Sequence, residues 1–458
     1  MPPVITNTEG VMKTPIADFI TKYLQSDATR LHMPGHKGNG FLGFEVYDIT
    51  EIQGADVLYS ADGIIAESEN NCSSLFGTAH SFYSAEGSSL AIKAMLSLAV
   101  TASGEERPTV IAARNAHKAF LYAAAWLDFH IQWLTPSVTD HLCACKVTKE
   151  EVENAILSSE KKPCAVYLTS PDYLGNLADI RGIAEVCQKH KIPLLVDNAH
   201  GAYLKFLQQD LHPITLGATM CCDSAHKTLP VLTGGAYLHI AQGADAYFVE
   251  NARNALASFA STSPSYLILA SLDQCNAYVS EAKEAFSACE KKVGKIKSLL
   301  SSCGCQILSD EPFKLTISAR EIGFTGEELA DYFRGYKIEC EFADEDYLVL
   351  MFSPQNRDID YQRVEKALSS AINEGRSKLA AKEAPPYVTP PTRLTPRQAI
   401  LARSETIPTK EAEGRIASSP TVSCPPAIPI VISGEVISKE IINRLLHYGI
   451  HEVAVVKE

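Results

Sequence analysis

The sequence, 458 residues long, predicts an α/β fold in which a doubly wound, mainly parallel sheet is followed by a smaller α+β domain and a C-terminal extension. Two observations lead to this fold class. Between Ser88 and Ile240, apolar runs of strand length alternate with segments of helical spacing. From about Ser280 the pattern changes to a long charged helix and shorter mixed elements. We therefore expect four parts: an arm (1–60), a large domain (61–275), a small α+β domain (276–376) and a C-terminal domain (377–458).

Within the large domain, the residues from Ser89 to Val100 have the spacing of a helix that buries one face, and a second helix is expected from Asp179 to His190. Short apolar runs bounded by polar or turn residues predict buried strands at Thr109 to Ala113, Cys164 to Thr169, Ile192 to Asp197, Ala218 to Cys222 and Ala236 to Ile240. In a doubly wound sheet ligands bind outside the carboxyl ends of the strands, so functional residues are expected directly after these runs.

The second half of the chain predicts a helix from Glu281 to Leu300, followed by strand, helix, strand, strand and helix through Gly375. A stretch with five prolines, Ala384 to Pro396, is typical of a linker or an extended strap. A strand at Ile428 to Ile432 and a helix near Ser438 to His447 come after it. We expect this tail to fold back onto the preceding domains.

The composition excludes several classes of protein. Hydrophobic residues make up 46% and charged residues 21% of the chain, which is the balance of an ordinary globular protein. A net charge of −13 repels phosphate backbones, so nucleic-acid binding is not expected. The first residues have no basic and apolar leader, and no apolar run reaches the roughly 18 residues of a membrane helix. We expect a cytoplasmic protein whose 13 cysteines are mostly thiols.

Two cysteine pairs, Cys143/Cys145 and Cys303/Cys305, could be read as metal ligands. Each pair has only one residue between its members, whereas zinc loops place two to four residues there. No histidine follows at the spacing of a zinc finger. We therefore expect no metal.

The most informative segment runs from Cys222 to Gly235, directly after a predicted strand. It places Lys227 in a loop with Ser224, His226 and Thr228, which are donors suited to a phosphate. A lysine there can form a Schiff base with an aldehyde cofactor, provided that its surroundings leave the amine nucleophilic. The alternative is a solvated surface charge, the usual state of a lysine.

A second segment, Leu194 to Gly201, is an apolar strand that ends in Asp197, 30 residues before the lysine. Pyridoxal phosphate needs an acid beside its pyridine nitrogen, because the protonated ring is the electron sink that stabilises a carbanion. Asp197 could supply that charge, with His200 as its supporting partner. The alternative is an aspartate that caps the next turn.

Two further segments complete the pattern. Gly87, Ser88 and Ser89 open a predicted helix, where exposed amides and the helix dipole favour an anion, although the same residues also make a good helix cap. His117 follows another strand, where an imidazole could stack on the cofactor ring; a lone histidine there can also be structural.

The order phosphate cup, stacking histidine, pyridinium aspartate and Schiff-base lysine resembles that of the fold type I pyridoxal phosphate enzymes, the aspartate aminotransferase fold. More specifically, the chain is similar to the ornithine/lysine/arginine decarboxylase family from about Thr14 to Glu435. The segments that carry this resemblance are Arg30 to Gly38, Asp48 to Asp56, Thr169 to Gly175, Ser224 to Pro230 and Cys424 to Glu435.

The resemblance implies that pyridoxal 5'-phosphate is bound at Lys227, that Asp197 forms a salt bridge to its pyridine nitrogen and that His117 stacks on its ring. The implied phosphate contacts come from Gly87, Ser88, Ser89, Ser224 and His226. Thr262 lies in a segment that, in this fold, reaches toward the phosphate of a partner subunit. Pro34 to Lys37 and Asp48 to Asp56 are expected at the mouth of the site, across a dimer interface.

Three features differ from the family pattern. Glu86 stands before Gly87, where Asn or Thr is expected, and Asp223 stands before Ser224, where Gln is expected. Since an acid beside a phosphate is repelled, we expect both side chains to point away from it. The inducible bacterial members also carry an N-terminal wing that builds decamers, which this sequence lacks, so we expect a homodimer.

The implied activity is decarboxylation of arginine, lysine or ornithine to a polyamine precursor, with arginine slightly favoured. Lys227 or His226 would return a proton to Cα, and Asp56 and Glu51 are candidates for the distal cation of the substrate, although both could be solvated acids. An aminotransferase or carbon-sulfur lyase of the same fold remains an alternative. So does a non-catalytic regulatory relative, against which the joint presence of Lys227, Asp197 and His117 argues.

Overall fold

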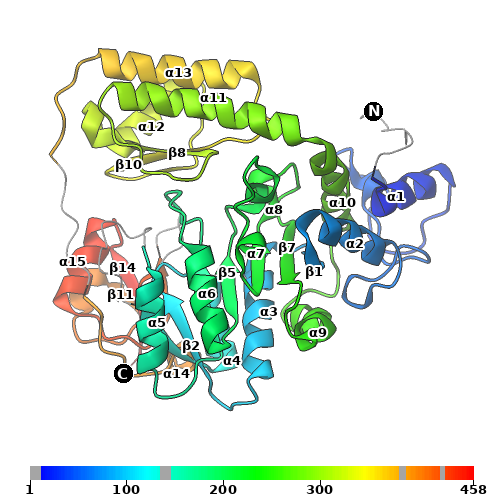
Figure 1. The fold of residues 1–458 in the computed structure, drawn as a ribbon, viewed down its shortest axis with the longest axis horizontal. Coiled ribbons are helices and arrows are strands. Elements are labelled where there is room, and N and C mark those ends of the chain that lie inside the picture. The colour runs from blue at the N-terminus through cyan, green and yellow to red at the C-terminus, as the bar shows by residue number, and fades with distance from the viewer. Residues whose placement is uncertain (1–11, 135–145, 381–387, 423–428, 458) are drawn as a thin grey trace. The chain divides into compact units, whose positions relative to one another are not determined.

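The computed structural model describes residues 12–134, 146–380, 388–422 and 429–457, and it has the α/β architecture that the sequence predicts (Figure 1). Its main sheet has seven strands in the order β1-β7-β6-β5-β4-β2-β3. The strands are β1 (Thr78–Ser84), β2 (Thr109–Ala113), β3 (His130–Leu134), β4 (Ala165–Thr169), β5 (Leu194–Asp197), β6 (Met220–Asp223) and β7 (Ala236–Ala241). Strand β7 runs antiparallel to β1 and β6, whereas β5 is parallel to β6, and β2 is parallel to β3 and β4.

The five predicted strands are confirmed, each within two residues at its ends. Strands β1 and β3 were not predicted. Strand β1 contains His80, Ser81 and Ser84 among its seven residues, and Ser81 and Ser84 are buried, so polar side chains interrupt the apolar pattern. Strand β3 begins with an exposed histidine and is only half-buried at an edge of the sheet. Its pattern is too polar for a buried strand.

The chain divides into two compact units, of which the first contains Met1–Ala102 and Leu195–Glu284. It holds β1, β6, β7 and all but the first residue of β5. Its helices are α1 (Pro15–Gln25), η1 (Glu45–Tyr47), η2 (Leu58–Ser60), α2 (Ile64–Phe76), α3 (Gly87–Ala102), η3 (Ala202–Phe206), α7 (Pro213–Leu216), α8 (Ala225–Thr228), α9 (Ala246–Ala257) and α10 (Tyr266–Glu281). Helix α3, whose face of Leu90, Ala91 and Met95 is buried, packs on β6 and β7.

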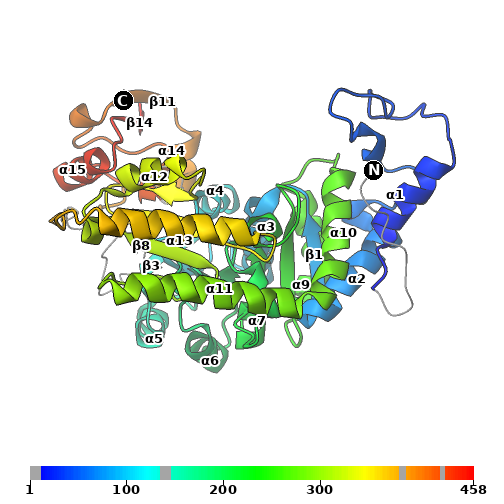
Figure 2. The same cartoon turned by 90° about the horizontal axis from the view of Figure 1, so that it is seen from above.

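The second unit contains Ser103–Leu194 and Ala285–Glu458. Its sheet strands are accompanied by α4 (Lys118–Leu127), α5 (Lys149–Ser158) and α6 (Ile180–His190). The segment predicted as a small domain, called the small domain below, contains α11 (Lys283–Ser302), whose first two residues belong to the first unit, and then β8 (Lys314–Ser318), η4 (Ala319–Ile322), α12 (Gly326–Gly335), β9 (Phe342–Ala343), β10 (Tyr347–Met351) and α13 (Asp358–Asn373). Its antiparallel sheet has the order β8-β10-β9, and α11 and α13 lie side by side over it (Figures 1 and 2). The predicted order of strands and helices is confirmed here.

The C-terminal segment has a small core of its own in which Ile430, Ile441 and Val455 are buried. Its elements are α14 (Pro396–Leu401), β11 (Ser404–Pro408), η5 (Thr409–Glu411), β12 (Thr421–Val422), β13 (Pro429–Val431), α15 (Lys439–His447) and β14 (Glu452–Val456). Helix α14 packs against α4, and Arg397 donates a hydrogen bond to the carbonyl oxygen of Trp126 at 3.1 Å. Within the second unit, the tail therefore folds back onto α4, as the sequence predicts.

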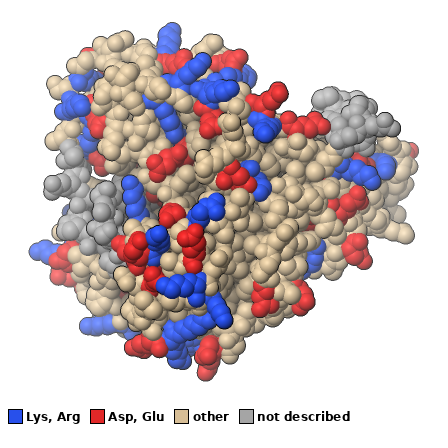
Figure 3. All heavy atoms as spheres, viewed as in Figure 1, with Lys and Arg blue, Asp and Glu red and all other residues tan. Residues whose placement is uncertain are grey.

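Acidic and basic side chains are mixed over the face drawn in Figure 3, so the net negative charge is not gathered into one patch there. Among the described residues, no helix combines the length and the apolar character needed to cross a lipid bilayer.

Candidate active site

Lys227 lies just beyond the carboxyl end of β6, in the short helix α8, and its side chain extends toward the neighbouring strand-end loop. The backbone amide of Lys227 donates to the carbonyl oxygen of Ser224 at 3.0 Å, which fixes the turn. Its Nζ lies 3.0 Å from Nε2 of His200, a buried residue that follows β5. Because β5 and β6 are parallel neighbours, their ends bring the predicted lysine and histidine together.

Asp197 is the last residue of β5 and is only 2% exposed. Its Oδ1 accepts hydrogen bonds from the amide of Ala199 at 3.1 Å and from the thiol of Cys222 at 3.6 Å. Burial, reinforced by the charge of Asp197, raises the pKa of the Cys222 thiol well above its usual value, so the thiol keeps its proton and donates it. Asp197 thus caps the following turn while its carboxylate stays in the strand-end region expected for the pyridine nitrogen.

The predicted phosphate cup combines the start of α3 with the end of β6. Gly87 has a φ of +72°, and its amide donates to the carbonyl oxygen of Gly234 at 2.7 Å. The hydroxyl of Ser224 donates to the hydroxyl of Ser88 at 2.8 Å, and Ser89 follows on the first turn of the 16-residue helix. A Cβ built on Gly87 would meet no atom within 4 Å, so the space beside the helix start is open. Open space and two hydroxyls at the start of a helix fit an anion.

The two unexpected acids beside this cup have partners elsewhere. Glu86 is exposed and accepts a hydrogen bond from the amide of Ser261 at 2.7 Å. Asp223 is fully buried; its carboxylate lies 3.0 Å from Nε2 of His212 and accepts a hydrogen bond from Asn198 at 2.7 Å. These contacts do not direct either carboxylate toward the hydroxyls of Ser88 and Ser224.

His226 has a defined tautomer. Its Nδ1 lies 2.9 Å from the carbonyl oxygen of Gly235, so Nδ1 carries the proton and Nε2 is the basic nitrogen. Burial lowers the pKa of His226, and the positive charge of Lys227 lowers it further, against the hydrogen bond to Gly235. The imidazole is therefore neutral at neutral pH.

The remaining predicted residues lie on other elements of the structure. His117 belongs to the second unit, where it caps α4: its Nδ1 accepts a hydrogen bond from the amide of Ala119 at 3.2 Å. Thr262 is exposed in the connection between α9 and α10 of the first unit. Of the cysteine pairs, Cys303 is exposed and Cys305 is buried, while Cys143 and Cys145 lie outside the described residues.

The carboxylate of Asp56 is hydrogen-bonded to backbone amides. It accepts hydrogen bonds from the amide of Val57 (2.8 Å), before η2, and from the amides of Gly63 (2.9 Å) and Ile65 (2.9 Å), at the start of α2. Burial favours a higher pKa for Asp56, but these amides outweigh it and the pKa is lowered. Asp56 is therefore an anionic helix cap, and Glu51 is exposed.

Sequence reasoning missed two residues beside the predicted ones. Among the described residues, both polar atoms of the Asn115 side chain and Oδ1 of Asn198 are buried and have no hydrogen-bond partner. Oγ1 of Thr228, next to Lys227, is in the same state. Buried polar groups are rarely left unpaired, so such atoms beside a predicted site are expected to meet a bound molecule or water. The available signal was sequence position: Asn198 adjoins Asp197, Thr228 adjoins Lys227, and Asn115 lies two residues before His117.

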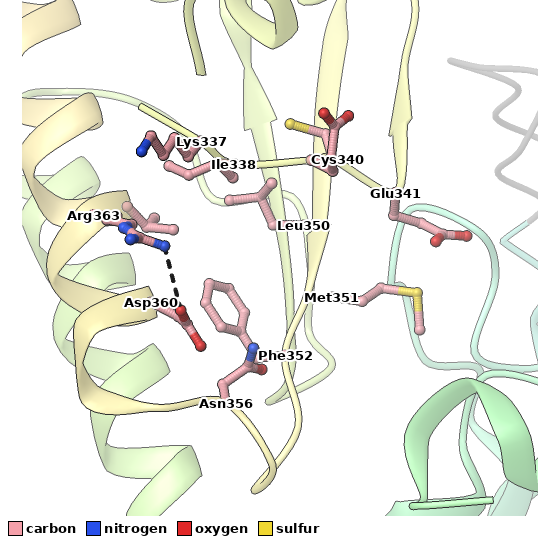
Figure 4. A pocket seen from close by; sticks show the side chains of 12 residues that line it. Lys337, Ile338, Cys340, Glu341, Leu350, Met351, Phe352, Asn356, Asp360 and Arg363 are labelled. Atoms are coloured by element: carbon pink, nitrogen blue, oxygen red, sulfur yellow. Dashed lines mark ion pairs between the residues drawn. The ribbon is translucent and has the colours of Figure 1, made fainter. Parts of the chain in front are cut away.

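A separate cavity of about 310 Å³ lies in the small domain (Figure 4). It is lined by residues 337–341, which precede β9, by the end of β10 and by helix α13. Asp360 and Arg363 on α13 form an ion pair across 3.8 Å beside it. No predicted site residue lines this cavity.

Comparison with known proteins identifies the family. The family model described as "Orn/Lys/Arg decarboxylase, major domain" matches residues 14–306, and that described as "Orn/Lys/Arg decarboxylase, C-terminal domain" matches residues 377–449. The chain is 29% identical to an arginine decarboxylase of Bacillus subtilis over 94% of this chain and 93% of that protein. It is 27% identical to an arginine decarboxylase of Halalkalibacterium halodurans over 93% and 91%.

Solved structures agree on the fold. The lysine decarboxylase of Francisella novicida matches with a TM-score of 0.79 at 17% identity, over 97% of this chain and 81% of that one. The constitutive lysine decarboxylase of E. coli matches with a TM-score of 0.74 at 17% identity, over 97% and 82%. The predicted α/β fold of the type I pyridoxal phosphate enzymes is thereby confirmed. The chain belongs to the Orn/Lys/Arg decarboxylase family and is an enzyme of the carboxy-lyase class.

Proposed function

We propose that this enzyme decarboxylates free arginine with pyridoxal phosphate held at Lys227. The observation that carries the proposal is the grouping of three functional elements in the first unit: the Lys227 amine, the Asp197 carboxylate, and the paired hydroxyls of Ser88 and Ser224. The choice of arginine is supported by the names of the curated relatives, which match over more than nine tenths of both chains.

The described residues fit this cofactor. Its phosphate matches the open start of α3 and the hydroxyl pair, and its aldehyde would be held by the amine of Lys227. When bound, pyridoxal phosphate supplies an electron sink for the pair of electrons that the departing carboxylate leaves behind. Asp197 would keep a proton on the pyridine nitrogen, with His200 supporting the site, and His117 of the second unit would cover the ring face, as the family resemblance implies.

Two groups can handle the proton that replaces the carboxylate on Cα. Lys227 is an exposed residue whose amine contacts Nε2 of His200 at 3.0 Å. His226 is neutral and presents Nε2 as its basic nitrogen, since Nδ1–H is engaged by Gly235. A neutral imidazole accepts a proton more readily than it donates one, so we assign proton donation to Lys227 and positioning of that amine to its neighbours.

The guanidinium of arginine needs an acid at the far end of the pocket, because a buried unpaired charge is costly. Asp56 already accepts hydrogen bonds from five backbone amides, so we assign binding of the distal cation to the exposed carboxylate of Glu51. The arm that contains Glu51 also exposes large apolar side chains: Leu31 is 89% and Leu42 is 71% exposed, and Phe41 is fully exposed. We propose that a second copy covers them, which makes the enzyme a homodimer with Thr262 reaching the partner's phosphate. The cytoplasmic location stays a prediction.

The test is incubation of the purified, cofactor-loaded protein with arginine, lysine or ornithine, scoring carbon dioxide and the amine product. Release of both from arginine, faster than from lysine or ornithine, is expected. Borohydride reduction followed by peptide mapping should retain the cofactor label at Lys227. Keto-acid formation without carbon dioxide would instead indicate an aminotransferase, and absence of label and turnover would leave the regulatory alternative. Light scattering would measure the mass of the assembly.

A further inference from the structure

Two loops carry five of the predicted site residues. The first, named here the loop of Asp197 and His200, begins with the last residue of β5, and the second, the loop of Lys227, follows β6 and contains Ser224, His226 and Lys227, the last two in α8. Any reaction at Lys227 depends on the separation of these loops, since a displacement of about 1 Å in a catalytic geometry is costly. What holds one loop against the other is therefore part of the site.

Besides the hydrogen bond from the thiol of Cys222 to Asp197, a shorter buried side-chain hydrogen bond joins the bases of the two loops. Nδ2 of Asn198 donates to Oδ1 of Asp223 at 2.7 Å, and both residues have no exposed surface. The backbone adds a second link, because the amide of Asn198 donates to the carbonyl oxygen of Cys222 at 2.9 Å. Asn198 adjoins Asp197, and Asp223 adjoins Ser224, so this bond lies directly behind the cofactor-binding residues.

The Asn198 side chain has little freedom. The amide of Gly201 donates to the carbonyl oxygen of Asn198 at 2.8 Å, closing the turn that leads to His200. A Cβ built on Gly201 would lie 2.0 Å from Oδ1 of Asn198, so the loop folds closely over that side chain. The orientation of the amide group is thereby fixed.

Asp223 is stabilised as a buried anion by two histidines. Oδ2 of Asp223 lies 3.0 Å from Nε2 of His212 and 3.3 Å from Nε2 of His239, and neither imidazole is exposed. Burial favours a raised pKa for Asp223, but the charge and hydrogen bonds of His212 and His239 outweigh it and lower the pKa. A buried carboxylate without such donors would be strongly destabilising.

The same three side chains could be read as a metal site, because one ligand atom of each lies within 4.8 Å of the others. The surroundings of His212 argue against that reading. The amide of Ile214 donates to Nδ1 of His212 at 3.4 Å, so the proton of the neutral ring is on Nε2 and points at Asp223. A metal on Nε2 would require a proton on Nδ1, facing the N–H group of Ile214.

We propose that Asp223 is a positioning residue that, through Asn198, fixes the loop of Asp197 and His200 against the loop of Lys227, with Nε2 of His212 and of His239 facing its carboxylate. The inference rests on the proposed use of these loops to hold pyridoxal phosphate. It also explains why an acid is tolerated where the family resemblance leads us to expect glutamine. The carboxylate accepts the hydrogen bond of Asn198 behind the phosphate cup and does not face the phosphate.

The experiment uses the full-length chain and two variants that each remove one partner of this bond, Asn198→Ala and Asp223→Ala. The first readout is hydrogen exchange of the cofactor-free protein over residues 197–204; we expect exchange about tenfold or more faster in both variants. The second readout is the dissociation constant of pyridoxal phosphate, measured by the absorbance of the bound cofactor; we expect a rise of about tenfold or more. Asp245→Asn, which alters the exposed cap of α9 in the same unit, is the matched control and should change neither.

The outcomes are separable. Unchanged exchange and unchanged cofactor affinity in folded variants would overturn the positioning role, even if Asp223→Ala lowers the melting temperature. About one metal ion per chain by elemental analysis of the wild-type protein would also overturn it. Should the wild-type protein bind no pyridoxal phosphate, the proposed function fails, whereas the exchange measurement on the cofactor-free protein still decides whether Asp223 and Asn198 hold the loops.

Discussion

Arg114 and Glu435 form a buried bidentate ion pair across 321 positions of the sequence. Nη1 and Nη2 of Arg114 donate to the two carboxylate oxygens of Glu435 at 2.8 and 2.7 Å. Glu435 also accepts a hydrogen bond from the amide of Ile432 at 2.9 Å. Arg114 directly follows β2 and stands three residues before His117, so the C-terminal segment holds the loop that carries the proposed stacking histidine.

Replacing Glu435 by Gln should therefore be costly. The Arg114 side chain is 9% exposed and the Glu435 side chain 1%, so the variant leaves a buried guanidinium without its anion. Breaking such a pair costs about 3–5 kcal/mol, and a clear loss in the free energy of unfolding, measured with urea, is expected. Weaker binding of pyridoxal phosphate should accompany it.

Glu405→Gln is the matched control. Glu405 pairs with Arg415 at 2.7 Å in the same C-terminal segment, but its side chain is 39% exposed. An exposed pair contributes at most about 1 kcal/mol, so this variant should resemble the wild type. Equal losses in both variants would contradict a special role for the buried pair.

The contrast between these ion pairs and the lysine proposed to hold the cofactor shows how far sequence reasoning reaches. Lys227 and Asp197 were singled out because each lies at or just after the end of an apolar run of strand length, and the fold class predicts where such residues meet. The β5 and β6 strands confirm that adjacency. Local patterns suffice where the functional side chain and its supporting strand are consecutive.

Long-range pairs leave no such pattern. The contacts of Asp223 with His212 and His239 come from three separate segments, and nothing in the spacing of those residues connects them. In the same way, Ser81 was not expected in a buried strand, because its hydroxyl is paired with Nδ1 of His239 at 2.8 Å in the fold. Partners supplied by the tertiary structure decide which polar residues can be buried, and the sequence does not name them.

Lys227→Ala should abolish covalent attachment of the cofactor. Without the amine, borohydride reduction should leave no label on the protein, and kcat for arginine should fall by about 10²–10⁴-fold, since proton donation to Cα is lost as well. Lys189→Ala is the control, because Lys189 forms a surface ion pair with Glu153. Normal turnover by Lys227→Ala would contradict the assignment of this lysine.

Asp197→Asn keeps the size of the side chain but removes the charge proposed to face the pyridine nitrogen. We expect the variant to retain the bound cofactor with an altered absorbance spectrum and to lose about a hundredfold or more in kcat, with a smaller change in KM. Asp210→Asn in the same unit, where Asp210 pairs with the partly exposed Lys205, should leave spectrum and rate unchanged. A wild-type spectrum in the Asp197 variant would argue that this carboxylate does not face the ring.

Asp273 makes the docking of α1 depend on pH. Its carboxylate accepts hydrogen bonds from the amides of Ile16 (2.9 Å) and Ala17 (3.0 Å) and from the hydroxyl of Ser68 (2.5 Å). Burial raises the pKa of Asp273 to about 7, against the effect of these donors. The folded state therefore keeps a proton that the unfolded chain, with a pKa near 3.8, has already released.

The sign of the effect follows from this difference in bound protons. The contribution of Asp273 to stability is complete below about pH 4 and is lost as the pH rises to about 7, with a slope of at most about 1.4 kcal/mol per pH unit in the free energy of unfolding. Asp273→Asn removes the ionisation but keeps an acceptor for the α1 amides, so its urea unfolding should lack this slope between pH 4 and 7. Asp331→Asn, at a carboxylate that is 76% exposed, should keep the wild-type slope. Parallel curves for the wild type and the Asp273 variant would show that this carboxylate is ionised throughout, in which case the amides of α1 outweigh its burial.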